Sequence, residues 1–258
     1  MSNSVSDCDA IRDNVCRAAT VARRPLRKRL ITIVCLGVIF LTVVCVAARF
    51  AFRSWFRLSL VERESAMACA INAVECYAVY YRKMALVASQ DASGRKIGSW
   101  RMAVSAYLRI SPPVDPHIAW YEEANRSASD TSWFPFCFIT RGEHSNETCV
   151  VAVTGNDTAF EAGLQFFDMP SDLIVLVEIA PCGFAWTSPY DVDINHLPEG
   201  LTRGFDGQGL FVGFRDNSVW YLDKSVPVDL IRKFCTTKGA SELDRDACLK
   251  PYKRFGFD

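Results

Sequence analysis

The most constraining feature of this chain is an uncharged apolar stretch near its start. Residues Leu30 to Ala48 read LITIVCLGVIFLTVVCVAA and contain no charged side chain. At about 1.5 Å rise per residue, a helix of this length matches a hydrocarbon core about 30 Å thick. The stretch therefore predicts a transmembrane helix over residues 29–49. A cleaved signal peptide is the main alternative, but its apolar region spans only about 7 to 15 residues and ends at a small-residue cleavage site, and the sequence ARFAFRSWFR that follows offers no such site.

Basic residues before this stretch predict its orientation. Arg and Lys crowd residues 12–29, immediately ahead of the apolar run. Because cytoplasmic flanks carry an excess of positive charge, we expect residues 1–28 to form a cytoplasmic basic tail. The predicted localisation is thus the cytoplasmic membrane, crossed once, with the C-terminal part of the chain extracytoplasmic.

The helical pattern continues beyond the apolar stretch. Residues 54–89 contain neither Pro nor Gly, and apolar residues recur at steps of three and four. This spacing predicts an amphipathic stalk helix over residues 50–90, continuous with the membrane span from near Arg29 to near Val87. The apolar positions of the stalk are Leu60, Ala66, Ala70, Ile71, Val74, Tyr77, Ala78 and Tyr81.

The remainder of the chain reads as a sheet domain over residues 91–250. Short β-like runs are separated by Pro, Gly, Asn and Asp. Half of all residues are hydrophobic, so the chain can bury a core, and the zero net charge lacks the basic footprint of a nucleic-acid binder. Helix followed by strands predicts an α+β fold, in which a long N-terminal helix packs on an antiparallel sheet. The β-like runs are SWRMAVSAYL, FPFCFITR, CVVAVTG, DLIVLVEIA, GLFVGF and SVWYLD.

Several of these segments, taken in order, resemble one family. CAINAVECYAVYY, GSWRMAVSAYL, FPFCF, CVVAVTGNDTAF, DLIVLVEIAPCGFAWTSPYDVDI, FDGQGLFVGFRDNSVWYL and TTKGASE follow the order of motifs in a pseudopilin-like family of unknown function. That family is abundant in planctomycete bacteria and is named for a C-terminal H-x9-DG motif. The resemblance covers roughly residues 65 to 245 and implies a pilin-like fold.

The resemblance also singles out particular positions. The most similar segment carries Glu178, Trp186, Pro189 and Asp191 at the family's spacing. The other matched positions are Cys69, Asn72, Trp100, Cys137 and Asp216.

The departures from the family pattern concern its N-terminus and its naming motif. The motif's His is Asp206 here, and its Asp-Gly is Asp216-Asn217, which suits a tight hairpin because Asn tolerates positive φ. Because this chain lacks the His but keeps the turn, we do not expect a catalytic or metal-binding role for that motif. The sequence RKRLITIVCLG lacks the Gly and Glu of a prepilin leader, so we expect an uncleaved anchor.

Patterns that carry catalysis or bind metal are missing from the sequence. His117, His144 and His196 are scattered, and no zinc-ligand spacing, phosphate-binding loop or nucleophile elbow occurs. Glu178 lies within an apolar strand-like run, where a carboxylate more often accepts hydrogen bonds from an Arg or a loop than acts as a general acid. We expect no cofactor, no metal and no small-molecule substrate.

Cysteine usage is high, with eleven residues, seven of them after residue 50. An extracytoplasmic location permits disulfides. The pairings Cys69 with Cys137 and Cys235 with Cys248 are two hypotheses, because sequence does not fix connectivity.

Two functions of different classes remain. The first is a non-enzymatic, membrane-anchored, pilin-like envelope protein that contacts the bilayer, other envelope proteins or copies of itself, and no nucleic acid. The second is a membrane-tethered enzyme or ligand-binding module that uses the Glu178 to Asp191 region. The second requires Glu178, Asp191, Asp193 and His196 to converge on one open pocket.

Overall fold

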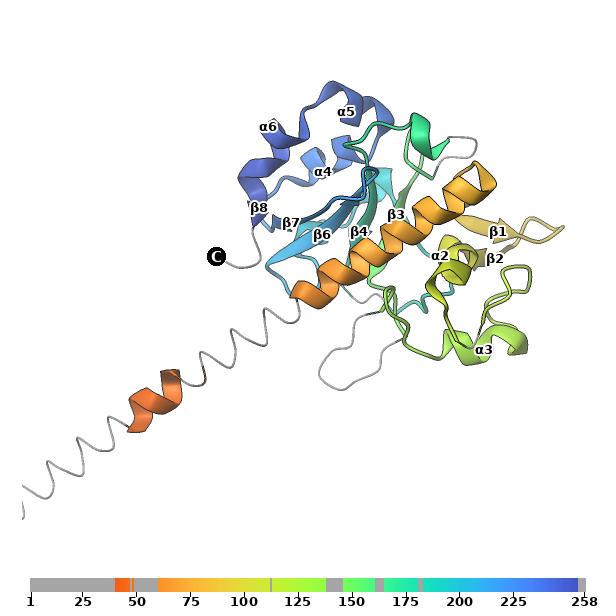
Figure 1. The fold of residues 1–258 in the computed structure, drawn as a ribbon, viewed down its shortest axis with the longest axis horizontal. Coiled ribbons are helices and arrows are strands. Elements are labelled where there is room, and N and C mark those ends of the chain that lie inside the picture. The colour runs from red at the N-terminus through yellow and green to blue at the C-terminus, as the bar shows by residue number, and fades with distance from the viewer. Residues whose placement is uncertain are drawn as a thin grey trace, which may run out of the picture. The chain divides into compact units, whose positions relative to one another are not determined.

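A computed structural model of the chain describes residues 40–46, 48, 60–111, 113–137, 146–160, 165–180 and 183–254. The chain divides into two compact units, Met1–Phe56 and Arg57–Asp258. Within the first unit, residues 40–46 and 48 are helical. The fold described below is that of the second unit (Figure 1).

The expected long N-terminal helix is wrong. In the second unit the first described helix comprises residues 60–81. It ends there because the next residue, Arg82, adopts a left-handed conformation with φ 55°. Residues 88–90, predicted as the end of the stalk, instead form a strand that pairs with the strand after it. Helix propensity alone could not predict that the helix ends at residue 81, because residues 88–90 instead pair with the next strand.

The described residues do not contain the predicted membrane span. No helix within the described ranges is long and apolar enough to cross a bilayer. Most of the stretch Leu30 to Ala48, on which that prediction rests, lies outside the described residues.

An α+β architecture is confirmed, built around a six-stranded sheet. The strand order is β5-β3-β4-β6-β7-β8, and a separate hairpin pairs β1 with β2. Neighbouring strands are antiparallel except for β3 and β5, which are parallel, so the expectation of a purely antiparallel sheet is corrected. The strands are β1 Ala88–Gln90, β2 Lys96–Ser99, β3 Val150–Thr154, β4 Ile174–Glu178, β5 Val192–Asp193, β6 Gly209–Phe214, β7 Val219–Asp223 and β8 Lys253–Arg254.

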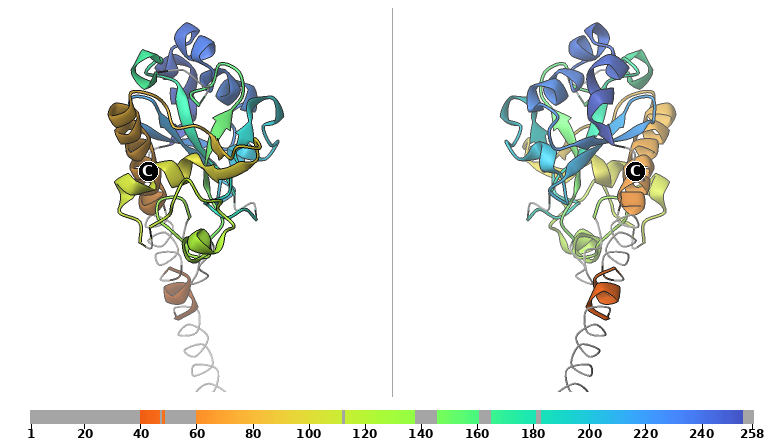
Figure 2. Two further views of the ribbon diagram at one scale, coloured as in Figure 1. Left: turned by 90° about the vertical axis from the view of Figure 1, so that its right-hand side faces the viewer. Right: turned by 90° about the vertical axis from the view of Figure 1, so that its left-hand side faces the viewer.

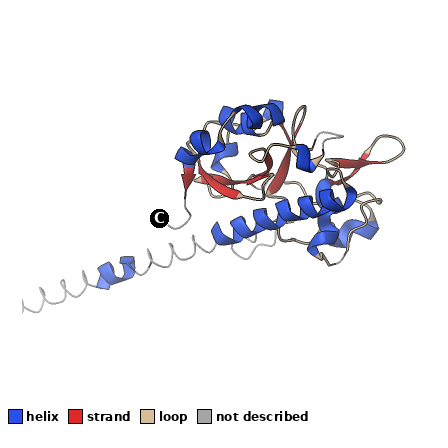
Figure 3. Cartoon of the chain, turned by 45° about the horizontal axis from the view of Figure 1, so that its top comes forward, coloured by secondary structure: helices blue, strands red, loops and turns tan. Residues whose placement is uncertain are grey.

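Short helices connect and flank these strands. Figure 2 shows the C-terminal helices, in blue, at one end of the unit and α3, in green, at the other. In Figure 3 the sheet lies between the C-terminal helices and the helix of residues 60–81. The α-helices are α2 Trp100–Val104, α3 Glu123–Ser129, α4 Val228–Phe234, α5 Thr237–Glu242 and α6 Arg245–Leu249; the 3-10 helices are η1 Ser105–Leu108, η2 Phe166–Asp168, η3 Ile194–His196, η4 Leu201–Arg203 and η5 Lys250–Tyr252.

The predicted strand at SWRMAVSAYL is wrong, because most of this segment forms α2 and η1. Four of the five residues of α2 are buried: Trp100, Arg101, Met102 and Val104. The segment therefore lacks the alternation of apolar and polar residues that would indicate a strand or an amphipathic helix. The central strands β3 (VVAVT) and β4 (IVLVE) read as strands in the sequence because branched apolar residues dominate them, and β6 (GLFVGF) because it is a short apolar run that contains Leu, Val and two Phe. Nearly every one of their residues is buried.

The helix of residues 60–81 packs its apolar stripe on the sheet. Leu60, Ala66, Ala70, Ile71, Val74 and Ala78 are buried as predicted. Gly213 on β6 allows close approach, since a Cβ at this position would lie 3.3 Å from the sulfur of Met67. Tyr81 departs from the pattern, because its side chain is 51% exposed.

The hairpin between β6 and β7 has the turn that the sequence predicts. Asn217 adopts φ 65°, and the amide of Phe214 donates to the carbonyl of Ser218 at 2.9 Å. Asp216 accepts hydrogen bonds from the amide and hydroxyl of Ser218 and forms an ion pair with Arg245 at 2.8 Å. Partial burial disfavours the Asp216 carboxylate, but the bonds from Arg245 and Ser218 outweigh it and hold the pKa below its ordinary value.

Asp216→Asn should lower the free energy of unfolding by about 1 kcal/mol at neutral pH, because it weakens the pair with Arg245. Since the pKa is lower in the folded than in the unfolded state, this stabilisation is complete above about pH 3.9 and is lost as pH falls through the folded pKa. Urea unfolding of both proteins across that range is the measurement. Asp229→Asn, in an exposed pair with Arg232, is the control, and equal curves for Asp216→Asn and wild type would refute the assignment.

Candidate functional site

Glu178, the strongest chemical candidate in the sequence, is fully buried at the end of β4. Arg63, on the helix of residues 60–81, donates to both carboxylate oxygens, with Nε to Oε1 at 2.6 Å and Nη2 to Oε2 at 2.8 Å. The amide of Phe211 on β6 donates to Oε2 at 2.8 Å. The expectation that Glu178 accepts hydrogen bonds from an Arg is therefore confirmed, and the pair joins the helix to two strands.

A second carboxylate completes the partners of Arg63. Its Nη1 lies 2.5 Å from Oδ2 of Asp206, which also accepts from the hydroxyl of Tyr221 at 3.2 Å. The guanidinium carbon lies 5.1 to 5.7 Å from the centroids of Phe205, Phe211 and Tyr221, within range of cation–π attraction. Asp206 is thus the part-buried member of an otherwise buried ionic cluster.

The charges of this cluster are strongly perturbed. Burial raises the pKa of Glu178, and the bonds from Arg63 and Phe211 offset only part of that rise. Burial opposes the charge on Arg63, but the hydrogen bonds and fields of Glu178 and Asp206 outweigh it, so the pKa of Arg63 is raised. Burial also raises the pKa of Tyr221, with Asp206 adding to the effect. A guanidinium held this way is a permanent counterion and not a proton donor.

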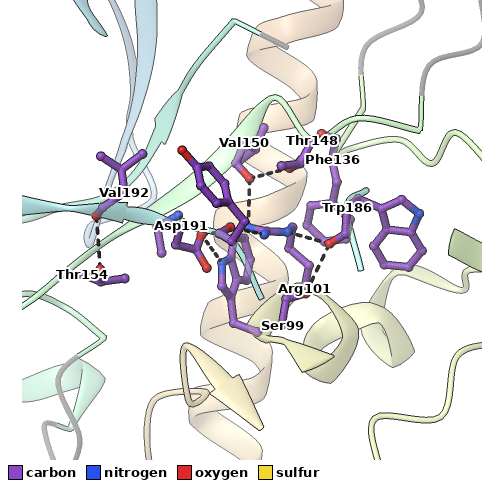
Figure 4. Close-up of polar contacts among 12 residues, drawn as sticks. Ser99, Arg101, Phe136, Thr148, Val150, Thr154, Trp186, Asp191 and Val192 are labelled. Atoms are coloured by element: carbon purple, nitrogen blue, oxygen red, sulfur yellow. Dashed lines mark hydrogen bonds and ion pairs between the residues drawn. The ribbon is translucent and has the colours of Figure 1, made fainter. Parts of the chain in front are cut away.

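A second buried arginine organises the Trp186 to Asp191 turn (Figure 4). Arg101 on α2 donates to the carbonyls of Trp186 at 2.8 Å and Tyr190 at 2.6 Å, and to Oδ1 of Asp191 at 2.9 Å. Further bonds reach the carbonyls of Val150 and Ser188. One side chain thereby satisfies carbonyls that the turn leaves outside the sheet ladder.

Asp191 accepts from two further donors, one on α2 and one on β3. Its Oδ1 accepts from the indole of Trp100 at 3.0 Å and from the amide of Ala152 on β3 at 2.8 Å. Burial raises the pKa of Asp191, and the charge of Arg101 counteracts it. The carboxylate therefore ties α2 to β3 and to its own turn.

Trp186 and the residues after it fill the core on one side of this turn. The Trp186 indole is fully buried, stacks on Phe136 at 5.5 Å, and donates to the carbonyls of Ala128 and Thr131. Thr187 shares a 2.8 Å hydrogen bond with Ser129. Pro189 lies between the two residues whose carbonyls bind Arg101 Nη2. Contacts from other elements of the fold thus hold the 186–191 segment in place.

The four residues that an active site in this region would need do not converge. Glu178 contacts Arg63 and Phe211, whereas Asp191 contacts Arg101, Trp100 and Ala152. Asp193 and His196 form an exposed pair at 3.2 Å, and the bonds from Asn195 and His196 keep the pKa of Asp193 low. These are three separate environments, two of them filled by protein.

Two surface hollows of the described residues lie elsewhere. One, of about 460 Å³, is lined by the hairpin and by the loop before α3, including Asp91, His117 and Glu122. Another, of about 360 Å³, lies at α5 and includes Asp157 and Lys238. Neither is lined by Glu178 or Asp191. Across the residues that the structure describes, no group of three or more His, Cys, Asp or Glu is arranged to hold a metal ion.

The cysteine pairings are corrected. Cys69, Cys137, Cys235 and Cys248 are all free thiols. Cys137 is buried in the core, where its amide donates to the carbonyl of Trp133, whereas Cys69 is half-buried on the helix of residues 60–81. Asn72, another of the matched positions, is exposed on the same helix. Burial raises the pKa of the Cys137 thiol to about 11 and also raises that of Cys235.

The sequence analysis missed Arg63 and Arg101, the two residues that hold these carboxylates. A signal for Arg63 existed, because it lies three residues after Leu60 and three before Ala66, inside the apolar stripe. For Arg101 the sequence carried no such signal, since its acceptors, the Asp191 carboxylate and four backbone carbonyls, belong to distant segments. No family model, curated protein or solved structure matches this chain.

Arg63→Met should lower the free energy of unfolding by about 3 to 5 kcal/mol, because it leaves the Glu178 carboxylate buried without its partner. The double variant Arg63→Met/Glu178→Leu should be more stable than the single one, since the fully buried Glu178 charge is removed with its partner and the remaining Asp206 is part-buried and keeps the hydrogen bond from Tyr221. Urea denaturation measures both.

Arg126→Met removes one partner of an exposed pair with Glu123 and serves as the matched control, with an expected loss of at most about 0.5 kcal/mol. A loss for Arg63→Met no larger than that of the control would contradict the structural role.

Thiol reactivity should divide the cysteines by burial. Cys137 and Cys235 should resist iodoacetamide in the folded protein, because their thiols are buried with raised pKa, while the half-buried Cys69 and Cys76 should be alkylated before them. Differential alkylation with mass mapping, native and then unfolded in urea, gives the order. Recovery of a Cys69–Cys137 disulfide peptide would overturn the correction.

Proposed function

We propose that this chain is a non-enzymatic interaction or assembly domain associated with the cytoplasmic membrane, facing the extracytoplasmic side. The observation that carries the proposal is the burial and complete hydrogen bonding of Glu178. The carboxylate with the best claim to chemistry is fully buried and bonded on both oxygens. A general acid or base must instead reach a substrate proton within hydrogen-bond distance.

The second carboxylate supports the same conclusion. Asp191 is almost fully buried, and its Oδ1 accepts from three donors that belong to the fold. An enzyme using the Glu178 to Asp191 region would need an open cleft between these side chains, and protein atoms occupy their surroundings. The rigid core is better suited to holding surfaces in fixed positions.

The membrane association rests on the sequence of the first unit. Residues 30–48 are uncharged and residues 12–29 are strongly basic, a combination that favours insertion with the N-terminus in the cytoplasm. The proposal does not depend on a stalk or on a filament.

The tagged full-length chain should pellet with membranes, resist alkaline carbonate, and be recovered after mild cross-linking in species larger than the monomer. Blue native electrophoresis of detergent-solubilised membranes measures the last point. Recovery of the monomer alone, from membranes shown to contain the chain, would contradict the assembly role.

Leu36→Arg with Ile39→Arg provides the control for the membrane arm. Two charges in the apolar stretch cost about 2.5 to 3.5 kcal/mol each at the centre of a bilayer, so this variant should leave the carbonate-resistant fraction. An unchanged distribution would refute anchoring by this segment while leaving the interaction role to the cross-linking result.

A further inference from the structure

Four tyrosines cluster at the C-terminal end of the helix of residues 60–81. The ring centroids of Tyr77 and Tyr81 lie 4.5 Å apart, those of Tyr80 and Tyr81 4.9 Å, and those of Tyr77 and Tyr107 6.4 Å. We call this set the tyrosine patch. Tyr80 is 73% exposed, although tyrosine rings usually pack against other protein groups.

Exposed aliphatic and basic residues accompany the patch. Val79 and Leu86 are 55% and 57% exposed; Val79 lies between Tyr77 and Tyr80 in the sequence, and Leu86 follows Tyr81 by five residues. Arg82 and Lys83 follow Tyr81 directly, and Arg109 follows Tyr107 by two residues; all three are exposed.

The two segments that form this surface contain no acidic residue. No Asp or Glu occurs between Cys76 and Gln90, or between Lys96 and Val114. A chain of zero net charge thus concentrates uncompensated positive charge beside its tyrosine patch. This charge favours an anionic partner.

Two of the arginines occupy unusual backbone positions. Arg82 has φ 55° and Arg109 has φ 52°, each at the end of a helix. Helix ends in this left-handed conformation ordinarily carry Gly or Asn, because a Cβ is disfavoured there. An Arg at both positions beside the same patch points to a use for the side chains and not to the needs of the fold.

We propose that this surface docks on an anionic lipid bilayer. Tyrosines sit at the boundary between headgroups and acyl chains, aliphatic side chains enter the acyl region, and Arg and Lys contact anionic headgroups. A nucleic acid or an acidic protein segment would use the charges but would leave Val79 and Leu86 without a matching environment. The inference rests on the proposed interaction role and names one of its partners.

The test uses the full chain reconstituted in vesicles of phosphatidylcholine alone and in vesicles that also contain phosphatidylglycerol. Hydrogen exchange of residues 79–86 and 105–110, read by mass spectrometry, should slow only in the anionic vesicles. Because each basic residue near an anionic surface contributes about fivefold to partitioning, Arg82→Gly with Arg109→Gly should weaken docking about 25-fold and abolish the protection.

The glycine variant removes charge at positions where Gly suits the backbone, so its melting temperature should equal or exceed that of the wild type. Lys238→Ala with Lys250→Ala removes the same charge from exposed positions on α5 and η5 and should leave the protection unchanged. Tyr80→Ser keeps every charge and should still weaken docking, which a purely electrostatic contact would not show.

Equal protection in both kinds of vesicle, or protection that survives in Arg82→Gly/Arg109→Gly, would overturn the proposal. So would the same slowing when soluble single-stranded DNA or polyglutamate is added to phosphatidylcholine vesicles, since that result assigns the surface to an acidic macromolecule. Each of these failures leaves the cross-linking result for the interaction role untouched.

Discussion

The ion pair between Arg63 and Glu178 is the contact on which the fold of residues 60–254 depends. It connects the helix of residues 60–81 to the centre of the sheet, with Arg63 1% and Glu178 0% exposed. Removing two charges from water is expensive, and the cost is recovered only when both groups are fully hydrogen-bonded. The Phe211 amide and Asp206 supply the remaining bonds, so the helix is held in one register on the strands.

A second arginine acts in the same way at the other side of the core. Arg101 gathers the carbonyls of the 186–190 turn, while Asp191 gathers the Trp100 indole and a β3 amide. Arg101 thus completes hydrogen bonds that the irregular 186–190 segment cannot satisfy by itself, whereas Arg63 neutralises the carboxylates of Glu178 and Asp206. The consequence for function is direct: the most conspicuous acidic residues of the sequence stabilise the core, and the surfaces that remain for partners lie elsewhere.

Much of the sheet could be predicted from local sequence. The cores of β3, β4, β6 and β7 were identified because apolar, branched runs bounded by turn residues favour strands, and Asp216-Asn217 was identified as a hairpin turn. The helix over 60–81 was visible in the spacing of its apolar residues. The segment at 100–108 was misread, because every side of α2 is in contact with protein and its residues carry no periodicity. The extension of the stalk was also wrong, since residues 88–90 pair with the neighbouring strand β2. The proposed disulfides are absent, since the separation of their thiols depends on distant segments.

The sequence by itself determined that this chain has an α+β unit with a helix on a sheet, and that Glu178, Trp186 and Asp191 belong to a structured turn and strand. Hydrophobic periodicity and turn chemistry are local properties, so they can be read along the chain. Only the tertiary structure decided which cations meet the two carboxylates and that the tyrosines at the helix end remain exposed. The two ion pairs join residues 115 and 90 positions apart in the sequence, a separation for which a single chain carries no local signal.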